Sequence, residues 1–177
     1  MEHIHKAIQE HGETVWKTAM RLLSNREDAL DCYQQTFLEA LEMSPSNVRS
    51  WKAVLTRIVT SRSLDRLRHR YRQRSRVQQL EHDPPTQDSP DQEILDAELI
   101  EHLRRVLANL PEMQSQAFWM LHLEKLSANQ IGEQLNIEPG NVRVIVHRAM
   151  VEVRKQLAGT WAPISNITPT TEGNFHE

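Results

Sequence analysis

The chain has 177 residues, of which 38% are hydrophobic, only 5% are aromatic and 5 are glycine. This composition favours an all-helical protein with one domain or two small ones. The single cysteine, Cys32, excludes an internal disulfide and a multi-cysteine metal site. Because there is no apolar run of about 18 residues and no signal-peptide pattern, we expect a cytoplasmic protein without a membrane span.

Charge is distributed unevenly along the chain. The formal net charge of −3 argues, taken alone, against a nucleic-acid-binding protein. Residues 49–76, however, carry ten Lys or Arg and one acid, Asp65, for a net charge of +9, whereas the rest carries 11 cations and 23 acids, for a net charge of −12. A chain polarised in this way is expected to present one face to an anion and other faces to other partners.

The first predicted helix covers residues 1–23. Its apolar residues recur at helical spacing: Ile8, Val15, Ala19, Leu22 and Leu23. His3, His5 and His11 also lie here, and a His-x-His pair can bind a metal ion. No carboxylate stands at a fixed offset from them that would complete a site, so we predict no metal and no cofactor.

The second predicted helix covers residues 27–43 and is capped by Asn25. The side expected to be buried contains Leu30, Tyr33, Phe37, Ala40 and Leu41. The opposite stripe contains Asp28, Asp31, Gln34, Gln35, Leu38, Glu39 and Glu42. An acidic stripe is usually only a solvated face, but an apolar residue within it also suits a docking surface for a basic partner helix.

A loop at residues 44–47 leads to a long predicted helix over residues 49–76. Its expected buried side contains Val54, Leu55, Ile58, Val59, Leu64 and Leu67. Eight arginines between Arg57 and Arg76 cover much of the rest. So many arginines on one helix would repel one another without a polyanion nearby.

The composition changes after this helix. The stretch HDPPTQDSPDQE contains three prolines, and from Asp83 to Glu101 there are seven acids and no Lys or Arg. This pattern predicts a flexible acidic linker between two small helical domains. The tail is rich in Thr, Pro and Asn and is expected to be disordered. The predicted division is a first domain over 1–78, a linker over 79–95, a second domain over 96–159 and a tail over 160–177.

The second domain begins with a predicted helix over 96–109. Its residues expected to point inward are Ile100, Leu103, Val106 and Leu107. Leu110-Pro111 ends this helix and starts another, and residues 126–157 then read as two helices joined by a short turn. Ser127 can cap the first of these two helices, and Pro139 fits the first turn of the second. Gly132 would let the two helices approach closely.

The last helix is amphipathic. Its buried side is predicted to contain Val142, Ile145, Val146, Ala149 and Val153. The opposite side contains Arg143, Val144, His147, Arg148, Val151, Arg154 and Lys155. Four cations and two valines suit DNA, because cations meet phosphates and base acceptors and an apolar side chain can meet a thymine methyl group. The pattern is that of a helix-turn-helix, although an ordinary helical hairpin with a solvated basic face remains an alternative.

Several motifs, in this order, resemble those of bacterial RNA polymerase sigma factors of the extracytoplasmic-function (ECF) type. Residues 28–38, DALDCYQQTFL, are similar to the family signature DAEDLVQETFL. Residues 61–68, SRSLDRLR, resemble N-x-x-x-D-x-x-R and match it at Asp65 and Arg68. Leu110-Pro111 resembles the opening of the family's region four.

The resemblance continues into the last helix and covers residues 5–158. PGNVR at 139–143 resembles the family's PGTVK, and HRA at 147–149 matches its HRA. The chain departs from the family pattern at Ser61, where Asn is usual, at Val54, where Trp is usual, at Gln116, and at Val144-Ile145, where Ser-Arg is common. These departures bear on the promoter sequence that is read rather than on the general activity.

The resemblance implies a non-enzymatic transcription initiation factor that binds core RNA polymerase, recognises the −35 and −10 promoter elements and promotes DNA melting. Implied polymerase-binding residues are Asp28, Asp31, Gln34, Gln35 and Leu38. Implied −35 contacts are Ser127, Asn129, Gln130, Asn141, Arg143, Val144, His147 and Arg148. Implied contacts with the melted −10 strand are Ser46, Asn47, Arg49, Trp51, Arg57, Ser61 and Arg62. Implied partners are core RNA polymerase, promoter DNA as duplex and melted single strand, and an anti-sigma factor.

Two other interpretations stay open. One is a stand-alone helix-turn-helix regulator whose N-terminal half senses a signal or dimerises, and the other is a helical adaptor that binds only protein. A free-standing regulator does not need ten cations on a separate helix, and an adaptor needs no cationic surface. No nucleophile–base pair, P-loop or metal cluster stands out, so no enzymatic activity is expected. Trp51 is as compatible with a place in the core as with stacking on a base.

Overall fold

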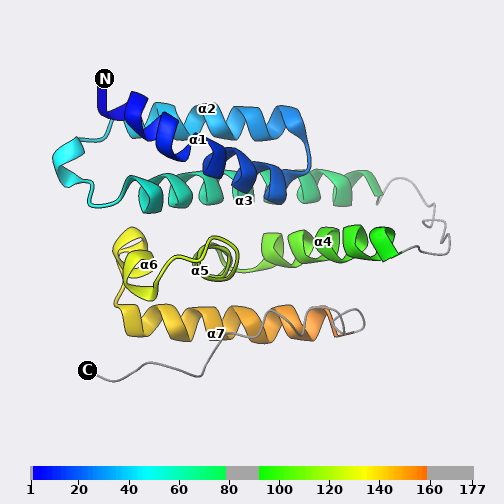
Figure 1. Ribbon diagram of the computed structural model, residues 1–177. Coiled ribbons are helices and arrows are strands. Elements are labelled where there is room, and N and C mark those ends of the chain that lie inside the picture. Colours follow the sequence, from blue (N-terminus) through cyan, green and yellow to red (C-terminus); the bar gives the residue numbers. More distant parts are fainter. Residues whose placement is uncertain (1, 79–91, 159–177) are drawn as a thin grey trace.

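A computed structural model of the chain describes residues 2–78 and 92–158 (Figure 1). These residues form helices and no strand, which confirms the all-α prediction. The helices of the first half are α1 (Glu2–Leu23), α2 (Arg26–Leu41), the 3₁₀ helix η1 (Pro45–Asn47) and α3 (Trp51–Gln78). Those of the second half are α4 (Gln92–Asn109), α5 (Glu112–His122), α6 (Ala128–Leu135) and α7 (Pro139–Gln156).

The predicted linker and tail are largely outside the described residues. The linker was expected over 79–95, but α4 already begins at Gln92, so only 79–91 remain of it and these are not described. The predicted tail over 160–177 is likewise not described. The division of the chain into domains therefore stays a prediction.

Local capping explains where several helices begin. The Asn25 side chain accepts a hydrogen bond from the Asp28 backbone N–H at 2.9 Å, which confirms the predicted cap of α2. At α6, the Ser127 hydroxyl accepts from the Gln130 N–H while the Gln130 side chain accepts from the Ser127 N–H, forming a full capping box. Asn136 ends α6 with a φ of 54°, a left-handed conformation that Asn tolerates better than most residues.

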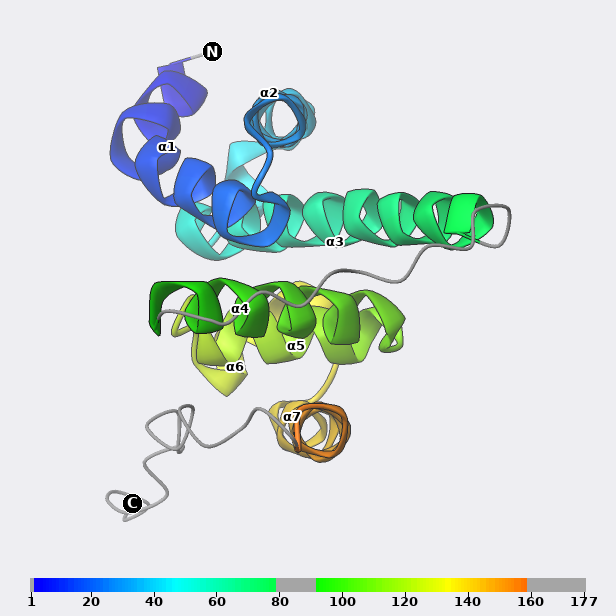
Figure 2. The same cartoon turned by 90° about the vertical axis from the view of Figure 1, so that its right-hand side faces the viewer.

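The helix α3 belongs to the first half and packs against the second. The helices α1 and α2 cover one side of it, α4, α5 and α6 pack against the other side, and α7 lies beyond them (Figures 1 and 2). All six residues predicted for its buried side are buried. One continuous core therefore joins residues from both halves, such as Leu55 and Leu67 of α3 with Leu107 of α4 and Trp119 of α5.

Three apolar positions were assigned wrongly from the sequence. Leu30 and Leu41 of α2 are 45% and 42% exposed, and Ile100 of α4 is 46% exposed. The buried face of α2 consists mainly of small residues, namely Ala29, Cys32, Thr36 and Ala40, together with Phe37. Small side chains let α2 pack closely against its neighbours, so this helix is turned with two large leucines outward.

Hydrogen bonds between polar side chains reinforce the packing of the two halves. The Glu124 carboxylate, in the turn after α5, accepts from the Thr18 hydroxyl of α1 at 2.8 Å and from the Trp119 indole at 3.0 Å. The Tyr71 hydroxyl of α3 donates to the Glu101 carboxylate of α4 at 2.8 Å. Buried polar groups paired in this way make one specific arrangement of the halves favourable.

The close approach of α6 and α7 depends on Gly132. A Cβ atom at this position would lie 2.6 Å from the Ile137 carbonyl oxygen and 3.4 Å from the Pro139 nitrogen, both of which are backbone atoms. We therefore expect Gly132→Ala to lower the free energy of unfolding by about 1–3 kcal/mol, as overpacking usually does. Urea denaturation followed by circular dichroism measures this change.

Gly140→Ala is the matched control. A Cβ atom at Gly140, in the first turn of α7, meets nothing within 4 Å. Alanine also has the higher helix propensity, so we expect a change of at most about 1 kcal/mol, in the stabilising direction. If both alanine variants unfold at the same urea concentration, the close contact at Gly132 does not limit the packing of α6 and α7.

Candidate nucleic-acid and polymerase-binding sites

The outer face of α7 carries the residues predicted to meet duplex DNA. Its exposed side chains are Arg143, Val144, His147, Arg148, Val151, Arg154 and Lys155. The opposite face is buried through Val142, Val146, Ala149 and Val153, while Ile145 is half-buried. The predicted amphipathic pattern is thus confirmed, and a continuous basic ridge is available to a groove of DNA.

The other four residues predicted for duplex contact have two different roles in the structure. Asn129 of α6 and Asn141 of α7 are exposed. Ser127 and Gln130 use their side-chain oxygens in the capping box, at 3.2 and 3.0 Å from the two backbone nitrogens. These two residues therefore fix the start of α6, which in turn positions α7.

Part of the predicted strand-binding set gathers in one recess between the halves. A pocket of about 350 Å³ is lined by Asn47, Arg49 and Arg57 from the first half and by Glu133 and Gln134 of α6. Arg49 lies 3.4 Å from the Glu133 carboxylate. The structure thus brings three of the predicted residues together, but it places α6 directly beside them.

Ser61 lies deeper between the halves. Its hydroxyl accepts a hydrogen bond from the Gln116 amide of α5 at 3.1 Å. Ser61, Arg57 and Gln116 line a second pocket, of about 370 Å³. Gln116 was recognised in the sequence only as a departure from a family pattern, and its contact with Ser61 shows that two departures from that pattern meet in space.

The remaining members of the predicted strand-binding set are scattered. Ser46 is exposed in η1, where its hydroxyl lies 2.9 Å from that of Ser44. Trp51 is half-buried and stacks on the His3 ring, with 5.7 Å between ring centroids. Arg62 donates to the Glu39 carboxylate of α2 at 2.6 Å. Trp51 therefore combines partial packing with partial exposure, and both of its interpretations stay open.

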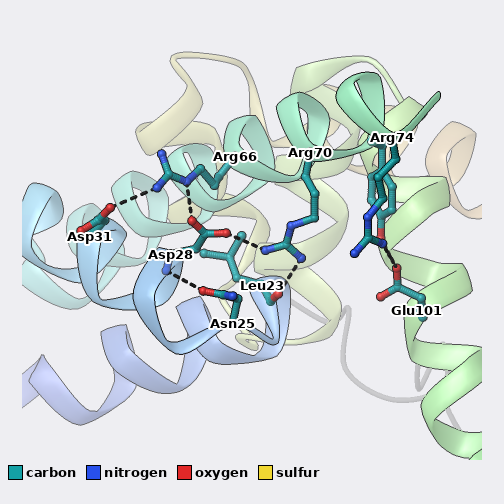
Figure 3. A network of polar contacts seen from close by, with 9 residues as sticks. Leu23, Asn25, Asp28, Asp31, Arg66, Arg70, Arg74 and Glu101 are labelled. Atoms are coloured by element: carbon teal, nitrogen blue, oxygen red, sulfur yellow. Dashed lines mark hydrogen bonds and ion pairs between the residues drawn. The ribbon is translucent and has the colours of Figure 1, made fainter. Parts of the chain in front are cut away.

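Carboxylates of α2 neutralise one side of the arginine-rich helix α3 (Figure 3). Arg66 donates to Asp28 at 2.8 Å and to Asp31 at 3.0 Å. Arg70 donates to Asp28 at 2.8 Å and to the Leu23 carbonyl oxygen, also at 2.8 Å. The expectation that these arginines need an external polyanion is therefore wrong for this side of α3, because the counter-charge comes from the neighbouring helix.

Asp28 is at the centre of this network. Burial would raise the pKa of its carboxyl group, but the hydrogen bonds and positive charges of Arg70 and Arg66 outweigh that effect and hold the pKa below its ordinary value. The group thus stays ionised in the folded protein and keeps both arginines in place. Asp28 thus connects the first turn of α2 to the interior of α3, and Arg70 extends the network to the end of α1.

The exposed surface of α2 is more apolar and less charged than the sequence indicated. Gln34, Gln35 and Leu38 are exposed as predicted, and Leu38 is 54% exposed. Leu30 and Leu41 are exposed on the same helix, whereas the predicted docking residues Asp28 and Asp31 pair with arginines of α3. The three exposed leucines, Leu30, Leu38 and Leu41, are hereafter called the α2 leucine patch. An apolar patch of this kind marks a protein-binding surface more readily than an acidic stripe does.

Within 2–78 and 92–158, no group of three or more His, Cys, Asp and Glu residues is arranged to hold a metal ion. Among the helices of the same two segments, none is both long enough and apolar enough to cross a membrane.

The fold and these surfaces define a class of protein. It is a helical protein whose C-terminal half is a helix-turn-helix with an exposed basic recognition helix, and whose N-terminal half is a three-helix unit with an apolar patch. Two family models match it in the same order. The model described as Sigma-70 region 2 matches residues 7–73, and the model described as Sigma-70, region 4 matches residues 100–153.

Individual proteins give the same result. The chain is 31% identical over 157 residues to the ECF RNA polymerase sigma factor SigE of Mycolicibacterium smegmatis, covering 85% of this chain and 60% of SigE. It is 26% identical over 158 residues to the ECF RNA polymerase sigma factor SigW of Bacillus subtilis, covering 83% of this chain and 84% of SigW. This chain belongs to the sigma-70 family of RNA polymerase sigma factors, and within it to the ECF type.

A solved structure has a similar fold. The sigma factor RpoE of Bartonella quintana, determined in complex with the anti-sigma factor NepR, superposes with a TM-score of 0.54 over 89% of this chain and 98% of RpoE. The sequence identity is 18%, so this likeness concerns the fold alone. Together with the family matches it confirms the resemblance recognised from the sequence motifs.

Proposed function

We propose that this chain is a transcription initiation factor that binds core RNA polymerase, recognises the −35 and −10 promoter elements and promotes DNA melting. The observation that carries the proposal is the exposed basic face of α7, held on a capped helix-turn-helix, in a chain whose two halves match sigma regions two and four. The factor performs no covalent chemistry itself and acts in the cytoplasm. Its activity consists of positioning core RNA polymerase on the promoter and of capturing the melted DNA strand.

The duplex is read by α7. In the proposal this helix enters the major groove, where Arg143 contacts a base edge and Val144 meets a thymine methyl group. Arg148 contacts a phosphate and fixes the orientation of the helix without reading sequence. Asn129, in the first turn of α6, and Asn141, in the first turn of α7, are exposed and contribute hydrogen bonds.

The melted −10 strand is held by the recess around Asn47, Arg49 and Arg57. The cations there contact the phosphate backbone of the DNA strand, and an aromatic side chain stacks on a base that has left the duplex. In the described arrangement Glu133 of α6 lies against Arg49, and Gln116 of α5 is hydrogen-bonded to Ser61. The proposal therefore requires α5 and α6 to withdraw from α3 before the strand enters.

An anti-sigma factor is also proposed as a partner. The similar RpoE is bound to the anti-sigma factor NepR in its solved structure. We infer that this chain has a partner of the same class, which competes with core RNA polymerase for the α2 leucine patch.

The experiment that tests the proposed function is co-purification with core RNA polymerase followed by run-off transcription. The full chain is expected to bind core and to direct initiation from a defined start site on linear DNA. If the chain binds duplex DNA but neither associates with core nor directs initiation, it is a stand-alone helix-turn-helix regulator. If it binds neither core nor DNA, the protein-binding adaptor becomes the better interpretation.

Two substitutions on α7 separate base reading from phosphate contact. Arg143→Ala is expected to weaken binding by about 1–3 kcal/mol at its cognate site and to relax one base position, because a bidentate contact with a base is lost. Arg148→Ala is expected to weaken binding to all sequences about equally. Titrations against a library of sites provide the comparison, and a uniform loss for Arg143→Ala would place that residue among the phosphate contacts instead.

A further inference from the structure

The arginines of α3 fall into two groups, and only one group is neutralised by α2. Four of them, Arg57, Arg62, Arg66 and Arg70, lie within ion-pair distance of α2 carboxylates. The other four line a cavity of about 730 Å³ together with an arginine of α4. The five arginines of this cavity are Arg68, Arg72, Arg74 and Arg76 of α3 and Arg105 of α4.

Among the side chains that the structure describes, this cavity is lined by more cations than paired carboxylates. Its described lining contains no carboxylate. Arg68 pairs with Asp65 at 2.8 Å, and Arg74 lies 3.8 Å from Glu101. Arg72, Arg76 and Arg105 form no ion pair with any side chain that the structure describes, that is, with those of residues 3–76 and 97–158. Like charges held this close are unfavourable unless an anion joins them.

We propose that the cavity between α3 and α4 is a binding site for an oligophosphate anion of the size of inorganic tripolyphosphate or a nucleoside triphosphate. The guanidinium group presents a planar fork of N–H donors that matches phosphate oxygens, and five arginines line this cavity. The volume falls in the range of about 300–1,000 Å³ that small-molecule sites occupy.

The shape of the site favours a small anion over the backbone of a nucleic acid. The Arg68 side chain is only 15% exposed, whereas that of Arg74 is 62% exposed, so the arginines line a recess from floor to rim. A duplex would touch only the rim and would leave the floor unused. Burial, together with the hydrogen bond to Glu101, raises the pKa of the neighbouring Tyr71 to about 12, so its phenol adds no negative charge at neutral pH.

The site is shared by the two halves of the chain. Arg72 belongs to α3 and Arg105 to α4, so an anion that contacts both adds a bridge between the halves. A ligand that binds only the packed arrangement stabilises it by mass action. Tripolyphosphate is therefore expected to raise the melting temperature of the full chain as well as to bind it, and neither effect depends on the proposed function in transcription.

Isothermal titration of the full chain with tripolyphosphate and, separately, with adenosine triphosphate tests the proposal. Wild type is expected to bind one tripolyphosphate per chain at about 0.15 M ionic strength. The double variant Arg72→Gln/Arg105→Gln is expected to bind at least about tenfold more weakly, because each arginine supplies charge-assisted hydrogen bonds. Both side chains are exposed, so these substitutions leave the packing unchanged. Adenosine triphosphate that binds as tightly as tripolyphosphate, or more tightly, also supports the site.

Lys52→Gln is the matched control. Lys52 is an exposed cation on the same helix and does not line the cavity, so its replacement is expected to leave the affinity unchanged. Equal affinities for the double variant and wild type would overturn the proposal, as would tripolyphosphate binding no tighter than sulfate. If only the affinity for a duplex oligonucleotide falls in the double variant, the arginines contact nucleic acid and the small-anion site does not exist.

Discussion

The substitution Leu38→Arg is expected to abolish the association of this chain with core RNA polymerase while leaving its helical content unchanged. Leu38 is 54% exposed in the last turn of α2 and contributes little to the core. Removing an apolar anchor from the centre of a protein interface typically costs 2 kcal/mol or more, which is at least about a 30-fold loss of affinity. The added guanidinium group must also be desolvated against whatever surface Leu38 meets, so the loss is expected to exceed that of a truncation to alanine.

Ile8→Arg serves as its control. Ile8 is 38% exposed on α1, in the same half of the chain, and is not part of the α2 leucine patch. Its replacement by arginine introduces the same charge on another helix and should leave polymerase binding within about twofold of wild type. Fluorescence anisotropy with labelled full-length chain and purified core gives both affinities. If Leu38→Arg binds as tightly as Ile8→Arg, the outer face of α2 is only a solvated surface.

The structural features that were predicted correctly depend on contacts between residues that are close to one another in the sequence. The cap at Asn25, the capping box at Ser127 and the start of α7 at Pro139 each involve residues no more than four apart. Such contacts are visible in a sequence because the chain alone brings the groups together. The basic face of α7 was predicted for the same reason, since a long amphipathic pattern fixes which side chains share a side.

The features that could not be predicted depend on which helix packs against which. Large residues such as Leu30 and Leu41 suggested the buried side of α2, but the side that meets α1 and α3 is lined by Ala29, Ala40 and other small residues. Periodicity identifies the sides of a helix, and it is the shape of the neighbour that decides which of them is buried. The exposure of Leu30 and Leu41 was therefore missed, whereas that of Leu38 was predicted, and the three leucines together are the best evidence for a docking surface.

The arginine–carboxylate network was missed for a related reason. Arg66 and Arg70 are separated from Asp28 by 38 and 42 residues, so their pairing follows only from the packing of α3 on α2. A signal was nonetheless present, because Asp28 and Asp31 share one side of their helix, and Arg66 and Arg70 share one side of theirs. Two complementary pairs at helical spacing would have indicated that part of the positive charge of residues 49–76 is neutralised internally. The arginines of α3 that α2 does not neutralise line the cavity between α3 and α4.

Replacing Asn47 and Trp51 together by alanine is expected to reduce promoter opening at least about tenfold, while binding to core RNA polymerase and to the −35 element stays close to wild type. Asn47 lines the recess proposed to hold the melted strand, and Trp51 follows the same loop at the start of α3. Stacking of a base on an aromatic side chain contributes about 1–3 kcal/mol, and loss of the Asn47 amide removes a hydrogen-bonding group beside it. Permanganate footprinting of unpaired thymines on linear templates measures the opening.

A second variant distinguishes strand capture from a structural role of Trp51. The ring of Trp51 stacks on His3, so His3→Ala loosens the packing of Trp51 without removing any residue proposed to contact DNA. If Trp51 acts by stacking on a base, His3→Ala should open promoters nearly as well as wild type, and a pre-melted template should restore the double variant in part. A pre-melted template helps because the cost of separating the strands is already met, so weaker capture suffices. Normal opening by the double variant would refute strand capture at this loop, and equal losses of opening in both variants would assign Trp51 to the core.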